Sequence, residues 1–132
     1  MPDMHIFEYA VIRVVPRVER DEFMNVGVVL FCNRQGFLKT RWHLDADRLR
    51  AFARHVPDVD ALVAEMTERL QAFERVCMGG PDGGPIGQLP AASRFRWLTA
   101  ARSTLLQTSP LHPGLSGDPA ATLERLFEQL VA

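Results

Sequence analysis

Residues 7–32, FEYAVIRVVPRVERDEFMNVGVVLFC, decide the fold. Two runs rich in β-branched and aromatic residues flank a short charged connection. In the first run, residues 6–15, both alternating faces are apolar, which predicts a central strand that is covered on two sides. Pro16 ends this strand because proline has no N–H group for a strand ladder. Residues 25–32 predict the second strand.

The segment that follows extends this pair into a meander. Residues 33–36, NRQG, are typical of a turn, and residues 37–44 predict a third strand. Gly27 lies inside the second strand, where glycine usually marks a bulge or a close backbone approach. The three runs together predict three antiparallel strands joined in sequence order.

Helical patterns dominate the middle of the chain. Asp45 and Asp58 are each placed to cap a stretch with apolar residues at helical spacing. Pro57 stops the first helix, and Gly79 followed by Gly80 ends the second. Residues 81–90 are rich in glycine and proline and predict a loop.

The last third of the chain gives weaker signals. Residues 90–101 favour a helix, and residues 103–109 favour a fourth strand that ends at Pro110. Asp118 followed by Pro119 predicts the start of a last helix, because proline is common at the first helical position. We therefore expect a single α+β domain over residues 1–132, with an antiparallel sheet of about four strands and helices packed mainly on one face.

Composition restricts the class of protein. The chain has 132 residues, a net charge of −1 and 47% hydrophobic residues, which gives no overall case for binding nucleic acid or membranes. No uncharged run approaches the roughly 18 residues of a membrane span. The start lacks the features of a signal peptide, and Cys32 and Cys77 lie in apolar runs typical of buried thiols in a reducing compartment. We expect a cytoplasmic protein without a metal or another cofactor.

The charged residues are unevenly distributed. No Asp or Glu lies between residues 82 and 118, although this interval holds several cations, whereas the connection between the first two strands is acidic. The cations can pair with those acids, bind an external phosphate or nucleic acid, or remain in water. We expect an arginine–carboxylate network between the two regions. The cations are Arg94, Arg96, Arg102 and His112, and the acids are Glu19, Asp21 and Glu22.

Arg13 is a second unusual charge. It interrupts the apolar pattern of the first strand, where a buried guanidinium is costly unless it is paired. Glu8, Glu22 or the amide of Asn25 could provide the partner. We expect a structural pairing.

Two ordered motifs resemble the signatures of a bacterial family known as domain of unknown function 3037. The first is Tyr9-Ala10-x-x-Arg13-x-x-Pro16-x-x-Glu19-Arg20-x-Glu22-x-x-Asn25-Val26-Gly27-Val28. The second is Arg94-Phe95-x-Trp97-Leu98 with Arg102-Ser103 and Gln107-x-Ser109-Pro110-x-His112-x-Gly114. Ala101 departs from the family, whose members often have proline there. The resemblance implies a small bacterial protein of unsettled role, often encoded beside a kinase-like protein similar to HipA.

These features give three functional hypotheses. The first is a non-enzymatic accessory or interaction protein, with a HipA-like kinase as a candidate partner. The second is an enzyme or sensor for a phosphorylated ligand, in which Arg96 and Arg102 clamp the phosphate and Glu22 or His112 moves a proton. The third is a nucleic-acid binder that uses Arg94, Arg96 and Trp97. The residues expected at a ligand or partner site are Arg13, Glu19, Glu22, Asn25, Arg96, Arg102, Ser109 and His112.

Overall fold

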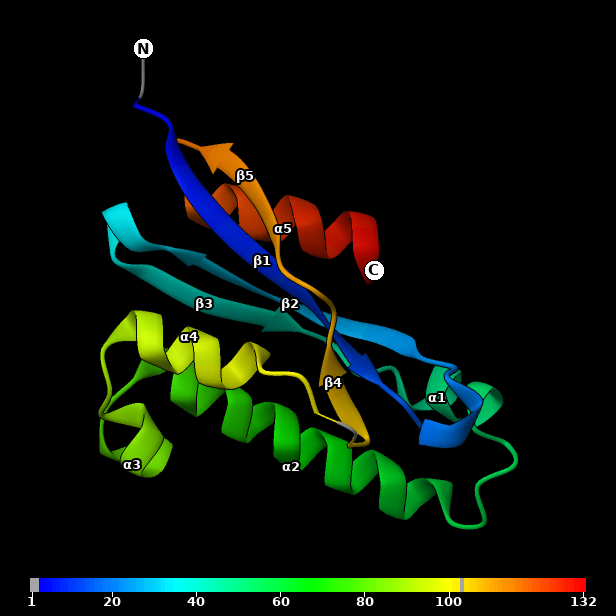
Figure 1. The fold of residues 1–132 in the computed structure, drawn as a ribbon. Coiled ribbons are helices and arrows are strands. Elements are labelled where there is room, and N and C mark those ends of the chain that lie inside the picture. Colours follow the sequence, from blue (N-terminus) through cyan, green and yellow to red (C-terminus); the bar gives the residue numbers. More distant parts are fainter. Residues whose placement is uncertain (1–2, 103) are drawn as a thin grey trace.

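The N-terminal meander is present in the computed structural model, which describes residues 3–102 and 104–132 (Figure 1). The strands are β1 (His5–Val14), β2 (Met24–Cys32), β3 (Phe37–Trp42), β4 (Leu106–Thr108) and β5 (His112–Ser116). The α-helices are α1 (Ala46–Phe52), α2 (Val59–Met78), α3 (Gly84–Gly87), α4 (Ala91–Thr99) and α5 (Pro119–Leu130). Short 3₁₀ turns are η1 (Val18–Arg20), η2 (Asn33–Gln35) and η3 (Pro81–Gly83).

Strand β1 lies at the centre of a five-stranded antiparallel sheet with the order β3-β2-β1-β4. One edge of β1 pairs with β2 along most of its length. The other edge pairs with β5 along its first half and with β4 along its second half. The expected α+β fold is thus confirmed, and the sheet has one strand more than the four expected.

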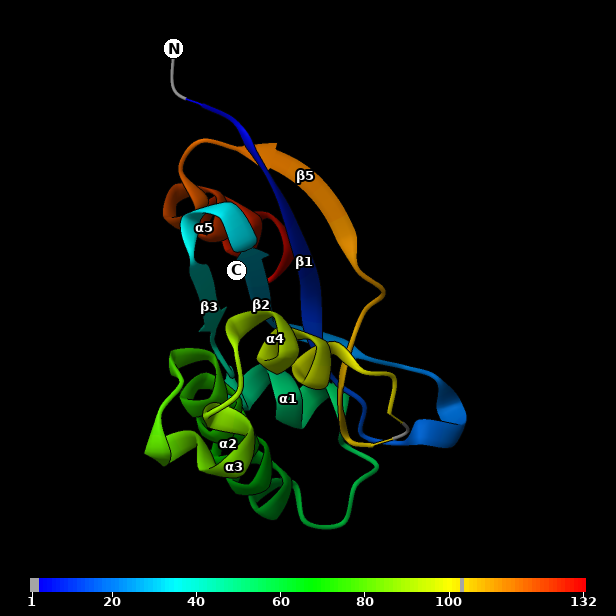
Figure 2. The ribbon, with the colours of Figure 1, turned by 60° about the vertical axis from the view of Figure 1, so that its left-hand side comes forward.

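Both faces of the sheet are covered (Figures 1 and 2). The larger cluster contains side chains of β1, β2 and β3 packed against α1, α2 and α4, with Ile12, Met66, Leu70 and Phe95 among its buried members. The smaller cluster packs α5 against the opposite face, around Phe127. Two-sided cover follows from the apolar pattern on both faces of β1.

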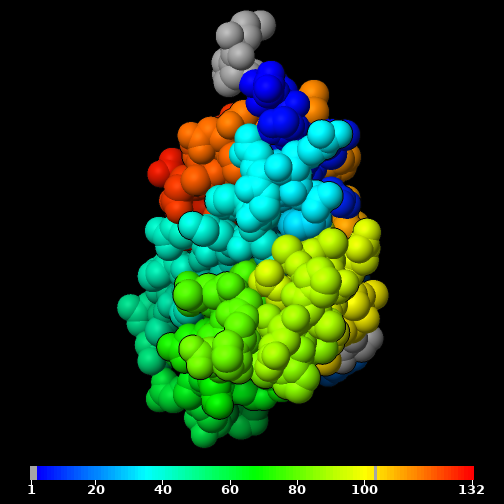
Figure 3. All heavy atoms as spheres, turned by 90° about the vertical axis from the view of Figure 1, so that its left-hand side faces the viewer, coloured from blue at the N-terminus to red at the C-terminus, as the bar shows by residue number. Residues whose placement is uncertain are grey.

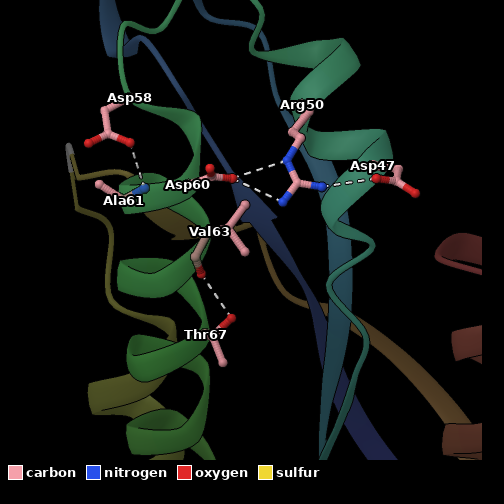
Figure 4. Close-up of polar contacts among 7 residues, drawn as sticks. All are labelled: Asp47, Arg50, Asp58, Asp60, Ala61, Val63 and Thr67. Atoms are coloured by element: carbon pink, nitrogen blue, oxygen red, sulfur yellow. Dashed lines mark hydrogen bonds and ion pairs between the residues drawn. The ribbon is translucent and has the colours of Figure 1, made fainter.

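The predicted helix starts are confirmed at the level of individual atoms. The side chains of Asp45, Asp58 and Asp118 accept hydrogen bonds from the backbone N–H groups three residues later. These bonds satisfy N–H groups that have no partner within the helix. Helices α1 and α2 are also joined at the surface, where Arg50 donates to Asp47 at 2.9 Å and to Asp60 at 3.0 Å (Figure 4).

The segment between α2 and α4 is more regular than the expected loop. It contains the turn η3 and the single-turn helix α3. Proline occupies an early helical position in each, and Gly79, Gly80 and Gly84 have positive φ angles that reverse the chain between the pieces. The glycine and proline residues therefore divide this stretch into short helical turns.

The region after α4 differs most from the expectation. The predicted fourth strand is shorter, since β4 contains only three residues, and Ser103 lies outside the described residues. Strand β5 was not predicted, because its sequence contains Pro113 and Gly114, and both residue types are unusual in strands. Among the described strands, β5 pairs with β1 alone, so Pro113 lies in an edge strand, where proline is tolerated.

Gly114 is required by a close approach from β1. Phe7 lies directly opposite on the neighbouring strand, and a Cβ atom at position 114 would stand 2.5 Å from the Cζ atom of its ring. Gly27 in β2 has a similar role, because a Cβ there would stand 2.8 Å from the Cβ of Trp42. The strand register also shifts between Ile12 and Arg13, next to Gly27, so both the expected bulge and the expected close approach are present.

We expect Gly114→Ala to lower the free energy of unfolding by about 1–3 kcal/mol, the usual cost of forcing extra atoms into a packed contact. Chemical denaturation followed by circular dichroism measures the change. In a Phe7→Leu background, which removes the outer ring atoms, the same substitution is expected to cost much less. Equal costs in the two backgrounds would show that the ring contact does not require the glycine.

Candidate functional site

The two motif regions meet through strand pairing. Arg13 of β1 lies opposite Gln107 of β4. The backbone N–H of Val11 donates to the hydroxyl of Ser109 at 2.8 Å, and the N–H of Ser109 donates to the carbonyl of Val11. The expectation that the two regions lie together is therefore correct for the backbone.

The expected arginine–carboxylate network is absent among residues 3–102 and 104–132. Glu22 pairs with its neighbour Arg20 at 2.6 Å, and both side chains are about half exposed. Glu19 is exposed and makes no ion pair with a described residue. The carboxylates of the first connection are therefore exposed to solvent, and Arg94 and Arg102 of the second region bind other groups.

Arg94 closes the carboxyl end of α2. Its guanidinium donates to the carbonyl oxygens of Val76 at 3.0 Å, Cys77 at 2.6 Å and Leu89 at 2.9 Å. The last carbonyls of a helix lack partners within the helix and carry partial negative charge, so a cation is favoured there. Gly79 makes room for this contact, because a Cβ at that position would stand 3.0 Å from Nη1 of Arg94.

Arg102 has the same role at α4. Its guanidinium donates to the carbonyl oxygens of Leu98 and Trp97, and its Cζ atom lies 4.6 Å from the centre of the Trp97 ring. Arg96, by contrast, is exposed, and no hydrogen bond or ion pair joins it to a described residue. Arg96 and Arg102 are therefore not arranged as a shared clamp.

The same kind of contact anchors α5. The Asn25 amide donates to the carbonyl of Leu130 at 3.1 Å, and Arg48 donates to the carbonyl of Val131 at 3.4 Å. Asn25 thus fixes the end of α5 to β2, a role that the sequence does not reveal. Its other amide atom, Oδ1, is buried without a hydrogen-bond partner among the described residues.

Arg13 is not paired with a carboxylate. Its Cζ atom lies 3.9 Å from the centre of the Phe23 ring, a geometry typical of a cation–π contact. Nε is buried and has no hydrogen-bond partner among the described residues. The predicted partners Glu8, Glu22 and Asn25 are therefore wrong, and an aromatic face takes their place.

Ser109 and His112 lie where the chain passes from β4 to β5. Ser109 is buried, and its hydroxyl also donates to the carbonyl of Pro110 at 2.9 Å, so its bonds join the strands. His112 is exposed, and its ring centre lies 5.2 Å from that of Tyr9 on β1. No hydrogen bond or ion pair joins either side chain to Glu22 among the described residues, and Glu22 pairs with Arg20.

Two surface features were not expected from the sequence. The first is a groove of about 260 Å³ between α2, α4 and β4, here called the α2–α4–β4 groove. Its lining includes Arg69, Phe73, Trp97, Leu98 and Arg102. Of these five residues, Trp97, Leu98 and Arg102 belong to the second motif, whereas Arg69 and Phe73 lie outside both motifs. The helical spacing of α2 predicted that Phe73 is core, but it gave no sign that the core opens beside Arg69.

The second feature is an apolar surface at the outer end of β1 and β5, here called the outer-end patch and formed by Met4, Ile6 and Leu115. Ile6 and Leu115 are cross-strand partners, so their side chains share one face. They are 67% and 60% exposed. A hollow of about 590 Å³ adjoins Met4 and Ile6 (Figure 3 shows this end, with β1 in blue beside the β2–β3 turn in cyan).

The described residues offer no metal site and no activated thiol. No group of three or more His, Cys, Asp or Glu side chains is placed to hold a metal ion in residues 3–102 and 104–132. Cys32 and Cys77 are both buried and free. Burial raises the pKa of the Cys77 thiol to about 12, against the smaller opposing effect of the Thr40 hydroxyl, so this thiol stays protonated at neutral pH.

Arg94→Met is expected to lower the free energy of unfolding by about 2 kcal/mol or more, since charge-assisted hydrogen bonds contribute about 1.5–3 kcal/mol each. Arg96→Met is the matched control on the same helix, and it should change stability by about 0.5 kcal/mol or less. Urea denaturation of the two variants measures both values. Similar decreases in the free energy of unfolding of both variants would contradict the assignment of Arg94 as the group that caps the end of α2.

The pKa of Cys77 predicts a pH effect on stability. Above about pH 9 the Cys77 thiol ionises in the unfolded protein but not in the folded protein. The contribution of Cys77 to the free energy of unfolding therefore decreases by roughly 1.4 kcal/mol per pH unit until about pH 12. Unfolding free energies of wild type and Cys77→Ala, measured between pH 8 and pH 10.5, should therefore converge as pH rises. A constant difference would contradict the raised pKa.

One further structural finding concerns membranes: in the described part of the chain, no helix has the length and apolar character needed to cross a bilayer.

Comparison with curated proteins and with solved structures finds no match. A family model described as protein of unknown function (DUF3037) matches residues 9–131. This match includes both motif regions and nearly the whole chain, and the protein therefore belongs to the DUF3037 family.

Proposed function

We propose that the protein is a non-enzymatic interaction module that binds a protein partner through the outer-end patch. The observation that carries this proposal is the exposure of Ile6 and Leu115, two apolar side chains paired across adjacent strands. Met4, which is 56% exposed, extends the patch. Contiguous exposed apolar surface with a polar rim is typical of protein-interaction sites.

The surroundings of the patch support this assignment. The hollow beside it is bordered by Asp3, Glu8, Asn33 and Arg34, so charges of both signs surround the apolar centre. Such a rim adds specificity and register to an interface whose centre excludes water. A kinase-like protein similar to HipA is the candidate partner that the family resemblance suggests. The two free, buried cysteines are consistent with a reducing compartment such as the cytoplasm.

The hypotheses that need Arg96 to act together with Arg94 or Arg102 receive less support. Arg94 donates to three backbone carbonyls, and Arg102 lies at the other end of α4, where it donates to the carbonyls of Leu98 and Trp97. Arg96 stands apart from them in solvent. An interaction module needs none of these groups to be available.

The double variant Ile6→Ser/Leu115→Ser tests the proposal. If both side chains are buried by the partner, their loss should weaken binding by about a hundredfold or more, because each buried aliphatic side chain contributes about 1.5–3 kcal/mol and 1.4 kcal/mol is tenfold. The measurement is isothermal titration calorimetry with a purified HipA-like kinase, the candidate partner.

Met78→Ser is the matched control, since Met78 is 79% exposed but lies at the end of α2, away from the patch. It should bind like the wild type. Failure of the wild-type protein to bind the kinase-like protein would show that this protein is not the partner. Unchanged affinity in the double variant would remove the patch as the interface.

A further inference from the structure

We propose that the α2–α4–β4 groove is a binding site for a small apolar molecule that carries one acidic group. This site is separate from the outer-end patch, and the lining residues of the groove include none of the patch residues. It therefore adds a ligand to the proposed interaction function and does not depend on the partner.

The floor of the groove provides the apolar part of the site. Phe73, Val76 and Leu98 line it, and all three belong to the larger buried cluster beneath the sheet. Leu98 is only 1% exposed, so the groove reaches the edge of the core. An apolar group placed there loses its contact with water, which is favourable by about 25 cal/mol per Å² of buried surface.

Two guanidinium groups provide the cationic part. Arg69 extends from α2 and Arg102 follows α4, and both line the groove. The carboxylate of Glu65 accepts a hydrogen bond from Arg69 at 2.9 Å, whereas no described carboxylate pairs with Arg102. The groove therefore has two positive charges and one negative charge at its walls, which favours an anionic ligand.

Arg102 is also held in position before any ligand arrives. Two of its N–H groups donate to the carbonyls of Leu98 and Trp97, and its Cζ atom lies 4.6 Å from the centre of the Trp97 ring. A guanidinium has five N–H donors, so three remain for a ligand. A donor that is already fixed loses little conformational entropy on binding, and this favours affinity.

The volume of the groove limits the size of the ligand. At about 260 Å³, the groove lies just below the range of roughly 300–1,000 Å³ typical of drug-sized ligands. A mostly apolar lining with a few polar groups that converge is the usual composition of such sites. The ligand is therefore smaller than a nucleotide, with an apolar body and a carboxylate or phosphate at one end.

The test uses three probes with the same tail: octanoate, octyl phosphate and the neutral octanol. Titration calorimetry on the wild-type protein should show at least one of the two anions binding about tenfold more tightly than octanol, the difference expected for one charge-assisted contact. The stronger of the two anions identifies the acidic group. Equal affinity of octanol and both anions, or no binding of any probe at millimolar concentration, would overturn the proposal.

Variants locate the site. Ala72→Phe fills the groove without removing a guanidinium and should weaken every probe by about tenfold or more, since the apolar body loses its space. Arg69→Gln should weaken the anions about tenfold and leave octanol within about twofold. Arg75→Gln, on the same helix but outside the lining, is the control and should bind all probes like the wild type.

The outcomes separate this site from the proposed partner surface. The Ile6→Ser/Leu115→Ser variant should retain the wild-type affinity for the anionic probe, because these residues do not line the groove. Loss of anion binding in that variant, or unchanged anion binding in Ala72→Phe, would place the ligand elsewhere and overturn the assignment of the groove.

Discussion

The need to cover strand β1 on both faces and both edges determines the arrangement of the molecule. Its apolar side chains face α2 and α4 on one side and α5 on the other. Its hydrogen-bonding edges are occupied by β2 and by the pair β4 and β5. Buried backbone groups without partners are costly, so a strand in this position requires neighbours from both ends of the chain.

Arginine has a different role here from the one that its charge suggests. Arg94 and Arg102 bind the last carbonyls of helices α2 and α4, and Asn25 with Arg48 does so for α5. The sequence does not reveal these contacts, because every residue has a backbone carbonyl and residue types do not show which carbonyls bind an arginine. For Arg94 and Arg102, helix carbonyls thus take the place of carboxylate partners.

Features with local causes could be predicted from the sequence, and features with distant causes could not. The caps at Asp45, Asp58 and Asp118 depend on N–H groups three residues away, and all three were predicted. Strand β5 depends on Phe7, more than a hundred residues earlier, which alone explains why a glycine fits in this strand. Of the predicted site residues, Arg13, Ser109 and His112 lie on or beside paired strands, but their side-chain partners depend on tertiary packing.

The bond between Val11 and the Ser109 hydroxyl joins residues that are 98 positions apart. During synthesis, β1 and β2 therefore leave the ribosome long before the strands that complete their edge. Contacts of such large sequence separation slow folding, because a long loop must close before they form. Throughout that interval, the edge of β1 that β4 and β5 later cover stays open, so the incomplete sheet is exposed to pairing with other chains.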